Sequence, residues 1–383
     1  MENTVSIVKC TGYDKCRKAI DKALSLIGGI GRYVKPGSRV VIKPNLVSKK
    51  RPDSAVTTNP DFVHAVICAV EEAGGIVTIA ESPGEPYTKP RLMSLYAACG
   101  MNKAIEGTKA VLNYENGFRE AEHPAGHTIK KMPIIDPILD ADVIINLPKL
   151  KTHVMTSYTG AVKNLFGVIP GNHKAELHFR LDDRTAFCSM LLDLCERVAP
   201  TLSIMDAIVG MEGNGPTSGT DRFMGLVMAS ADPYALDMVG CSVIGYDPME
   251  IETVRQSRER GYIPAAVGEL DIRGESIDAV MIPDVVKPET HFNLLKTANL
   301  PSWPNRLLVE KLSTKPRFEY KSCVSCGECA RCCPPKAIKM DSGRPVIDKS
   351  KCIRCFCCQE LCPKSAVTVK RPLLNRLMMK FFG

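Results

Sequence analysis

Residues 323–334 read CVSCGECARCCP and residues 352–363 read CIRCFCCQELCP, so one cysteine pattern occurs twice in the C-terminal part of the chain. Both copies, called here the first half and the second half, have the spacing C-x2-C-x2-C-x3-C-P. Two further cysteines fall outside the pattern, because Cys332 aligns with Leu361 and Cys357 aligns with Glu328. The repeat predicts a small C-terminal module with four equivalent cysteines in each half.

The spacing in each half is typical of [4Fe-4S] clusters. Three cysteines of one half converge on one cluster, and the fourth, before proline, reaches the other cluster. Zinc is the alternative, but zinc sites favour two separated C-x2-C pairs. We interpret Cys332 and Cys357 as packing or cluster-adjacent residues rather than ligands. The predicted ligands are Cys323, Cys326, Cys329 and Cys362 for cluster one, and Cys352, Cys355, Cys358 and Cys333 for cluster two.

This module resembles the bacterial two-cluster ferredoxins, which implies a small α+β domain that carries electrons. It is also basic: residues 301–383 contain 17 Lys and Arg against 6 Asp and Glu, whereas the rest of the chain is slightly acidic. Cluster binding would neutralise part of this excess positive charge. The remainder either forms solvated surface or steers an acidic electron donor such as ferredoxin or flavodoxin. No aromatic-basic interleaving accompanies the charge, so nucleic acid is not the expected partner.

Composition and length divide the chain into several parts. We expect an α/β domain over residues 1–300, a proline-rich linker over 301–318, the ferredoxin-like domain over 319–372 and an amphipathic tail over 373–383. The tail either docks on the protein surface or contacts a membrane. Neither a signal peptide nor a membrane span is recognisable, and 17 cysteines suit metal ligation in a reducing compartment, so we expect a cytoplasmic protein.

The first 250 residues alternate β-branched runs with segments of helical periodicity. Candidate strands lie at 5–8, 39–44, 76–80, 110–114, 142–147, 202–205 and 225–229. Candidate helices lie between them at 14–27, 60–73, 184–198 and 232–244, with Asn59 and Asp232 as N-caps. This alternation predicts an α/β domain with a largely parallel sheet and flanking helices.

Ligands of such sheets bind beyond the carboxyl ends of the strands, and several predicted strands end in polar residues. Lysines at this edge suit a small anionic substrate or cofactor, and a histidine there suits general acid/base chemistry. We expect catalytic roles for His153, Lys151 and Asp206, and cofactor- or substrate-binding roles for Lys43, Asn45, Lys149, Lys163, Asn164 and Glu212.

The segment 146–179 is the richest in such residues. Its TGAVKNLFG stretch predicts a short helix whose N-terminus holds an anion. His173 and His178 with Glu176 form an alternative metal site, although their spacing matches no established zinc motif. A P-loop and a complete G-x-G-x-x-G are absent from the sequence, so nucleotide binding is unsupported. A flavin or an additional metal remains open without positive support.

Several separated motifs resemble the family called domain of unknown function 362: KPNLV (43–47), TTNPDFVHAV (57–66), ESPG (81–84), INLPKLKTH (145–153), TGAVKNLFGVIPG (159–171), MDAIVGMEGNGP (205–216) and ASADPYALD (229–237). The resemblance implies an iron-sulfur redox protein of bacteria or archaea, often anaerobic, and supplies no substrate.

The favoured hypothesis is an oxidoreductase in which two clusters pass single electrons to a small anion in the α/β domain. The alternative is an electron carrier whose large domain is a docking platform for partners. A structural role of the clusters in a scaffold or nucleic-acid-binding protein is the third hypothesis.

Overall fold

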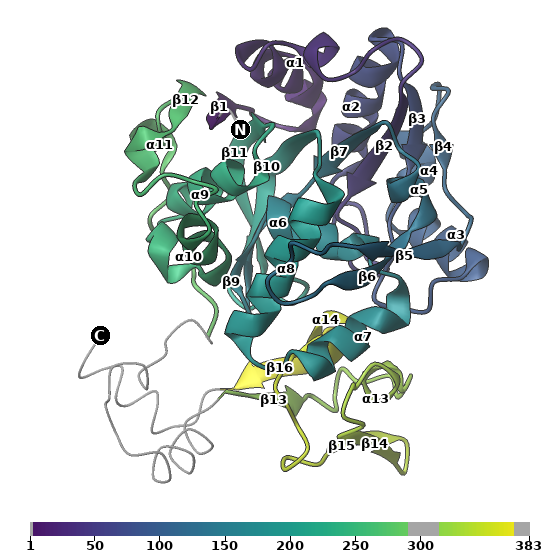
Figure 1. The fold of residues 1–383 in the computed structure, drawn as a ribbon. Coiled ribbons are helices and arrows are strands. Elements are labelled where there is room, and N and C mark those ends of the chain that lie inside the picture. The colour runs from purple at the N-terminus through teal and green to yellow at the C-terminus, as the bar shows by residue number, and fades with distance from the viewer. Residues whose placement is uncertain (1–2, 290–313, 371–383) are drawn as a thin grey trace.

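The computed structural model of the protein describes residues 3–289 and 314–370. The large domain is built on a mixed sheet with the strand order β12-β1-β11-β10-β7-β2-β3-β4, to which β8 and β9 attach beside β10 (Figure 1). Strands β10, β7, β2, β3 and β4 run parallel, whereas β11 runs antiparallel to both of its neighbours. The predicted α/β class with a largely parallel sheet is thus confirmed. The strands are β1 (Thr4–Lys9), β2 (Arg39–Pro44), β3 (Ile76–Ile79), β4 (Val111–Leu112), β7 (Val143–Leu147), β8 (Lys149–His153), β9 (Ser157–Thr159), β10 (Leu202–Glu212), β11 (Thr220–Ser230) and β12 (Asp271–Gly274).

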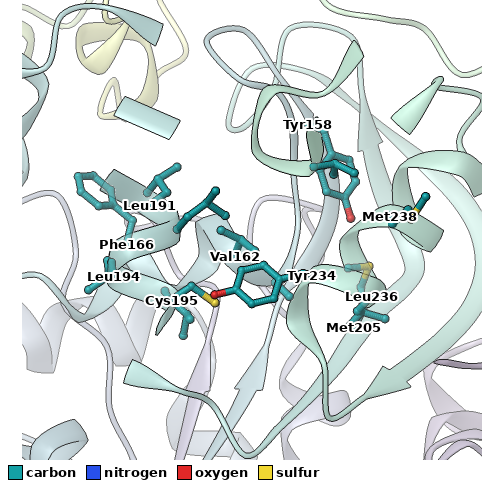
Figure 2. Close-up of a cluster of buried hydrophobic side chains, with 14 of the residues drawn as sticks. Tyr158, Val162, Phe166, Leu191, Leu194, Cys195, Met205, Tyr234, Leu236 and Met238 are labelled. Atoms are coloured by element: carbon teal, nitrogen blue, oxygen red, sulfur yellow. The ribbon is translucent and has the colours of Figure 1, made fainter. Parts of the chain in front are cut away.

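Helices cover both faces of this sheet. Side chains alternate along a strand, so Val40 and Ile42 of β2 enter a first hydrophobic core and Val41 enters a second hydrophobic core. Figure 2 shows part of the second core, in which Tyr158 and Tyr234 pack among aliphatic side chains. The first core contains α1 (Cys16–Leu26), α2 (Pro60–Glu72) and α3 (Lys89–Ala98), and the second contains α6 (Ala161–Asn164), α8 (Arg184–Val198), α9 (Pro233–Val243) and α10 (Glu252–Glu259).

The predicted helix caps are confirmed. The Asn59 side chain accepts the N–H of Asp61 at 2.8 Å, and Pro60 occupies the first helical position of α2. The Asp232 side chain accepts the N–H of Tyr234 at 2.8 Å at the start of α9. Shorter elements complete the domain: α4 (Met101–Ala104), the hairpin of β5 (Phe118–Glu122) and β6 (Lys131–Ile135), α5 (Asp136–Leu139), α7 (Gly171–Arg180) and α11 (Ile277–Val280).

The C-terminal module is a small α+β unit. Its outer strands β13 (Lys315–Phe318) and β16 (Val367–Lys370) pair antiparallel, and β14 (Ile338–Asp341) forms a hairpin with β15 (Arg344–Ile347). Each cysteine half contributes one short helix, α13 (Glu328–Arg331) or α14 (Cys357–Glu360). Residues 315–318, assigned to the linker in the sequence, are therefore part of the module's sheet. Residues 301–313 of the expected linker and the expected tail 373–383 lie outside the described residues.

Within residues 3–289 and 314–370, no helix combines the length and apolar character needed to cross a membrane.

Candidate functional site

A cavity of about 100 Å³ lies where the C-terminal module meets the carboxyl-end edge of the sheet. One water molecule needs roughly 10–15 Å³, so the space suits a small molecule. Both domains line this interdomain cavity. The large domain contributes Asn45, Glu81, Ser82, Lys151, His153, Lys163, Asn164, Lys174 and His178, among others, and the module contributes Cys332, Cys357, Glu360 and Leu361.

The second half of the module holds the two domains together. Gln359 is fully buried; its side chain donates to the carbonyl oxygen of Asn214 at 3.0 Å, and its own carbonyl accepts the hydroxyl of Thr217 at 3.3 Å. Leu361 packs against Gly84, where an added Cβ would lie 2.7 Å from Leu361 Cδ2. Figure 1 shows α14 against the large domain, with α13 and the β14–β15 hairpin farther from it.

Two further contacts strengthen this docking. Lys50 Nζ of the large domain donates to the carbonyl oxygen of Cys362 and to Ser365 Oγ, both at 3.3 Å. Phe356 forms a small buried cluster with Val154 of the large domain and Val369 of β16. The second half is thus fixed to the sheet edge by polar and apolar contacts.

Lys151 is a fully buried lysine with neutral partners. Its Nζ lies 2.5 Å from Asn45 Oδ1 and 2.6 Å from the carbonyl oxygen of Val56. Burial, followed by the positive charges of Lys149 and Lys163, lowers its pKa well below the ordinary value. An anion in the cavity would favour the charged form of this side chain.

Lys43 and Glu81 form a buried ion pair beneath the cavity. Their Nζ and Oε2 atoms are 2.6 Å apart, and Lys43 also lies 3.3 Å from Asn164 Oδ1. The Asn45 side chain donates to the same Asn164 oxygen at 2.9 Å. Lys43 balances the negative charge of Glu81, so Glu81 does not offset the positive charge of the lysines that line the cavity.

His153 presents one defined nitrogen to the cavity. Its Nδ1 accepts the N–H groups of Met155 at 3.0 Å and Thr156 at 3.3 Å, so the proton of the neutral ring is on Nε2. Nε2 lies 3.2 Å from Glu360 Oε1, but the two atoms are not aligned as a hydrogen bond, and neither has another partner in the described structure.

The charge states of this contact follow from burial and neighbouring charges. Burial, helped by the charge of Lys163, lowers the pKa of His153 to about 4 despite the carboxylate beside it. Burial alone would raise the pKa of Glu360, but the contact with His153 and the charge of Lys163 outweigh it and lower the pKa to about 2. At neutral pH an imidazole therefore faces a carboxylate.

An aromatic wall completes the cavity. His178 stacks on Phe187 with ring centroids 4.4 Å apart, and its Nδ1 is buried without a hydrogen-bond partner among the described residues. Burial lowers the pKa of His178 to about 3. Lys163 Nζ lies 5.7 Å from the Phe166 ring centroid and 5.9 Å from that of Phe187. These ring faces support the ammonium group at the cavity wall.

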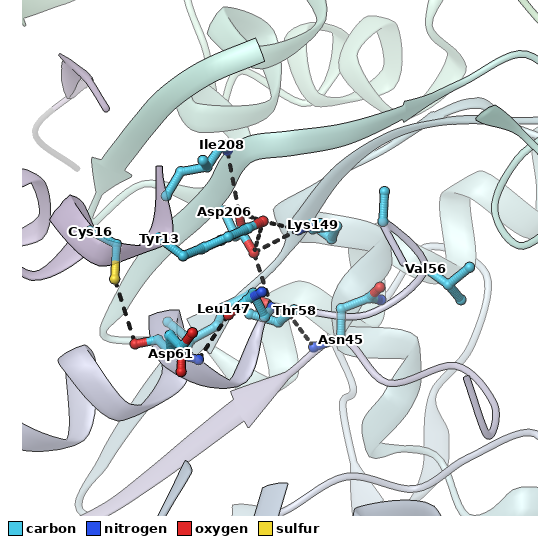
Figure 3. A network of polar contacts seen from close by, with 12 residues as sticks. Tyr13, Cys16, Asn45, Val56, Thr58, Asp61, Leu147, Lys149, Asp206 and Ile208 are labelled. Atoms are coloured by element: carbon cyan, nitrogen blue, oxygen red, sulfur yellow. Dashed lines mark hydrogen bonds and ion pairs between the residues drawn. The ribbon is translucent and has the colours of Figure 1, made fainter. Parts of the chain in front are cut away.

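Three of the predicted site residues lie elsewhere. Lys149 pairs with Asp206 at 2.7 Å, and the hydroxyl of Tyr13 contacts both, as Figure 3 shows. Glu212 accepts the N–H of Val286 at 3.1 Å. None of these acidic or basic groups lines the interdomain cavity. The structure brings together Asn45, Lys151, His153, Lys163 and Asn164, with Lys43 directly beneath.

The N-terminus of the TGAVKNLFG helix, α6, is already occupied. Asp237 Oδ1 accepts the N–H of Ala161 at 2.5 Å, and its Oδ2 accepts that of Val162 at 3.0 Å. The anion expected at this helix end is therefore a carboxylate of the protein itself. Burial raises the pKa of Asp237 to about 7.

The alternative metal site is not assembled either. His173 Nδ1 lies 3.7 Å from Glu176, while His178 turns away into the aromatic wall. Across the ranges that the structure describes, no three His, Cys, Asp or Glu side chains are placed to hold a single metal ion.

Lys174 and Glu360 also line the cavity, although neither was among the residues predicted for the site. Lys174 Nζ donates to the carbonyl oxygens of Ser82 and Pro83, and burial lowers its pKa to about 7. Nothing in the local pattern around Lys174 distinguishes it from a surface lysine. Glu360 did carry a signal, since it differs from its counterpart Arg331 in the repeat.

The structure groups the cysteines of each predicted set. Cys323, Cys326, Cys329 and Cys362 line one small cavity in the module. Burial, followed by the three other thiols of this set, raises the pKa of Cys329 to about 11.

The second predicted set is grouped in the same way. Burial raises the pKa of Cys333, and the thiols of Cys355 and Cys352 raise it further. Equivalent backbone N–H groups, of Ala337 and Ala366, donate to Cys333 Sγ and Cys362 Sγ at 3.2 Å. The fourth cysteine of each half therefore lies near the first three cysteines of the other half.

Comparison with known proteins agrees with this architecture. Residues 40–242 match the domain of unknown function DUF362, and residues 315–363 match the 4Fe-4S dicluster domain. The protein belongs to the DUF362 family. Its dicluster domain gives this DUF362 protein an iron-sulfur electron-transfer role.

Two comparisons with individual proteins illustrate the range of similarity. The DUF362 protein is 34% identical over 296 residues to the thylakoid-associated protein sll1697 of Synechocystis sp., with 75% of this chain and 90% of that protein covered. The lactate racemase apoprotein from Thermoanaerobacterium thermosaccharolyticum is 15% identical with a TM-score of 0.38; the match covers 62% of this chain and 56% of that chain, so this chain spans little more than half the racemase's length.

Proposed function

We propose that this DUF362 protein is an oxidoreductase in which two [4Fe-4S] clusters supply single electrons to a small anionic substrate bound in the interdomain cavity. One observation carries the proposal: a single cavity is walled on one side by basic residues of the large domain and on the other by the C-terminal module. A carrier with a passive docking platform would not need such a cavity.

The charge distribution favours an anion. Lys151, Lys163 and Lys174 line the cavity, whereas Glu81 is already neutralised by Lys43. Glu360 is the other lining carboxylate. Lys151 is fully buried with only neutral hydrogen-bond partners, which is unfavourable for its ammonium form, so a bound anion would stabilise that form. Lys163 and Lys174 would add positive charge at the cavity wall. His153 would hold or donate a proton from Nε2, the ring nitrogen that faces the cavity.

The position of the module supports the same proposal. Cys332 and Cys357 line the cavity and directly precede Cys333 and Cys358, two predicted ligands of cluster two. Electron transfer into the cavity therefore needs no path through the large domain.

The opposite side of the module suits an electron donor. Cys326 of the first half is exposed, and so are the basic residues Lys336, Lys339 and Lys349. We propose that an acidic one-electron donor such as ferredoxin or flavodoxin docks here, in the cytoplasm.

The test uses the full chain purified without oxygen. The clusters are reduced chemically, and their visible absorbance is followed after mixing with a panel of small carboxylates and phosphate esters that carry a reducible carbonyl group or carbon–carbon double bond. We expect at least one compound to reoxidise the clusters. Lys163→Ala and His153→Ala should slow that reaction by about tenfold or more, because they remove a cavity charge and the proton-bearing nitrogen. Reoxidation by a viologen dye should not change.

The control is Lys9→Ala, which removes a surface lysine paired with Glu275 far from the cavity residues. Reoxidation by protein acceptors alone, with no small compound active, would favour the electron-carrier hypothesis over the oxidoreductase.

A further inference from the structure

Three buried polar atoms around the interdomain cavity lack hydrogen-bond partners in the described structure: His153 Nε2, His178 Nδ1 and Glu360 Oε1. Native proteins rarely leave such atoms unsatisfied without a reason. His153 and His178 are almost fully buried, with 1% and 3% of their surface exposed. His153 Nε2 and Glu360 Oε1 lie 3.2 Å apart but are not aligned as a hydrogen bond, so a polar ligand in the cavity would supply the missing partners.

Glu360 is the unusual member of this set. A cavity built only to attract an anion gains nothing from a carboxylate beside Lys163 and His153, because like charges repel. Lys43 already neutralises the other lining carboxylate, Glu81, at 2.6 Å. The Glu360 oxygen can only accept hydrogen bonds, so its partner in a ligand must be a donor.

The same side chain distinguishes the two halves of the module. The first half has Arg331 at the equivalent position, where it is exposed and pairs with Glu328 at 2.6 Å. Holding a cluster therefore does not require an acid at this place in the repeat. The acid at this position, Glu360, occurs in the second half, whose helix α14 lines the cavity.

We infer that Glu360 selects short carboxylates that also carry a hydrogen-bond donor, a hydroxyl or an amino group, over carboxylates that lack one. The ligand's carboxylate would contact the lysines of the large domain, and its donor would reach Glu360 Oε1. This inference rests on the proposed function of the cavity and specifies the substrate class. It makes the iron-sulfur module part of the recognition site as well as the source of electrons.

The experiment measures binding by calorimetry on the full chain with its clusters intact. Five probes are compared: acetate, glycolate, glycine, propionate and lactate. Wild-type protein should bind glycolate or glycine about tenfold or more tightly than acetate, because a site built to bond a donor rejects the analogue without it. Glycolate against glycine tells a hydroxyl from an ammonium group, and lactate against propionate repeats the test in a longer acid.

Glu360→Leu removes both accepting oxygens and should reduce the preference for the donor to less than about threefold. Glu360→Asp should retain part of it. The matched control is Glu328→Leu, which removes one acid from the same domain, beside Cys329, at a position that does not line the interdomain cavity. Iron content and the electron paramagnetic resonance signals of each variant establish that the clusters are retained.

The outcomes are distinguishable. Equal binding of acetate and glycolate by wild type, a comparison that needs no variant, would overturn the inference while leaving an anion-binding cavity in place. Retention of the preference in Glu360→Leu would overturn the inference, because the selectivity would then come from another residue. Failure of all five probes to bind would also overturn it, and the cluster-reoxidation experiment would then decide separately whether the proposed function stands.

Discussion

The two halves of the module share one cysteine pattern but have different surroundings. In the first half Cys326 is exposed, whereas its counterpart Cys355 in the second half is half-buried. The residues that make the second half dock are those in which the halves differ: Phe356, Gln359, Glu360 and Leu361 replace Gly327, Ala330, Arg331 and Cys332. The shared positions are the predicted cluster ligands, and the differing positions place the second half against the cavity.

Docking of the second half is accompanied by backbone strain at Phe356. This residue has a φ of 60°, and its counterpart Gly327 has a φ of 72°, so both occupy the left-handed region that favours glycine. A bulky residue there is strained by roughly 1 kcal/mol or more. The buried contacts of Phe356 with Val154 and Val369 offset that strain. The first half, which has no such contacts, retains the glycine.

The largest expected effect comes from removing one cluster ligand in each half. Cys329→Ser and Cys358→Ser should each reduce the iron content, to about half if one cluster is lost. Cys358→Ser should in addition abolish reoxidation by small molecules, because its half adjoins the cavity. Iron analysis with the reoxidation experiment checks this. Equal residual activity of the two variants would remove the functional distinction between the halves.

Phe356→Gly makes the second half resemble the first at its central turn. We expect a net loss of about 2–4 kcal/mol in docking stability, since lost packing of about 3–5 kcal/mol exceeds the relief of strain. Hydrogen exchange of the amides in 356–369 should accelerate accordingly. Gly327→Ala is the control: it introduces local strain of about 1 kcal/mol and should leave exchange in 356–369 unchanged. Unaltered exchange in Phe356→Gly would contradict the role given to this side chain.

The cavity should also respond to pH through Lys174, whose pKa is lowered to about 7 by burial. The side chain is charged below that pH and neutral above it. Anion affinity should therefore fall, by up to about tenfold, as the pH rises from about 6 to about 8. Lys174→Met should flatten the profile. His153, with a pKa of about 4, should contribute no change in that range.

The smallest expected effect concerns Lys50, whose Nζ donates to the backbone carbonyl oxygen of Cys362, the predicted fourth ligand of cluster one. Lys50→Gln removes a positive charge that favours the reduced state. The potential of cluster one should fall by up to about 59 mV, a tenfold change for a one-electron couple. The potential of cluster two should change less. A redox titration followed by electron paramagnetic resonance resolves the two, and a larger shift in cluster two would contradict the assignment of Cys362 to cluster one.

Much of the fold was predictable from local patterns. Strand periodicity located β1, β2, β3, β7, β10 and β11, and the Asn59 and Asp232 caps marked helix starts, because both signals depend on residues close in sequence. Strand β8 was missed. It follows β7 after a single Pro148, and its basic residues resemble a loop more than a buried strand.

The candidate site was only partly predictable. The strand-end rule located the edge of the sheet and five lining residues. The rule also predicted Lys149 as a site residue, which does not line the cavity. Lys149 lies on the same strand as His153 but four residues away, about 13 Å along the strand. Asp206 and Glu212 were included for the same reason, although their partners lie at other points of the sheet.

The sequence by itself determined the two cysteine sets and the α/β class, because ligand spacing and side-chain alternation are encoded over a few neighbouring residues. Only the tertiary structure decided that Glu360, Cys332 and Cys357 line a cavity with Lys151 and His153. These residues are some two hundred positions apart in the chain. Their meeting depends on the docking of one domain on another, and burial by that docking sets the charge states of the groups inside.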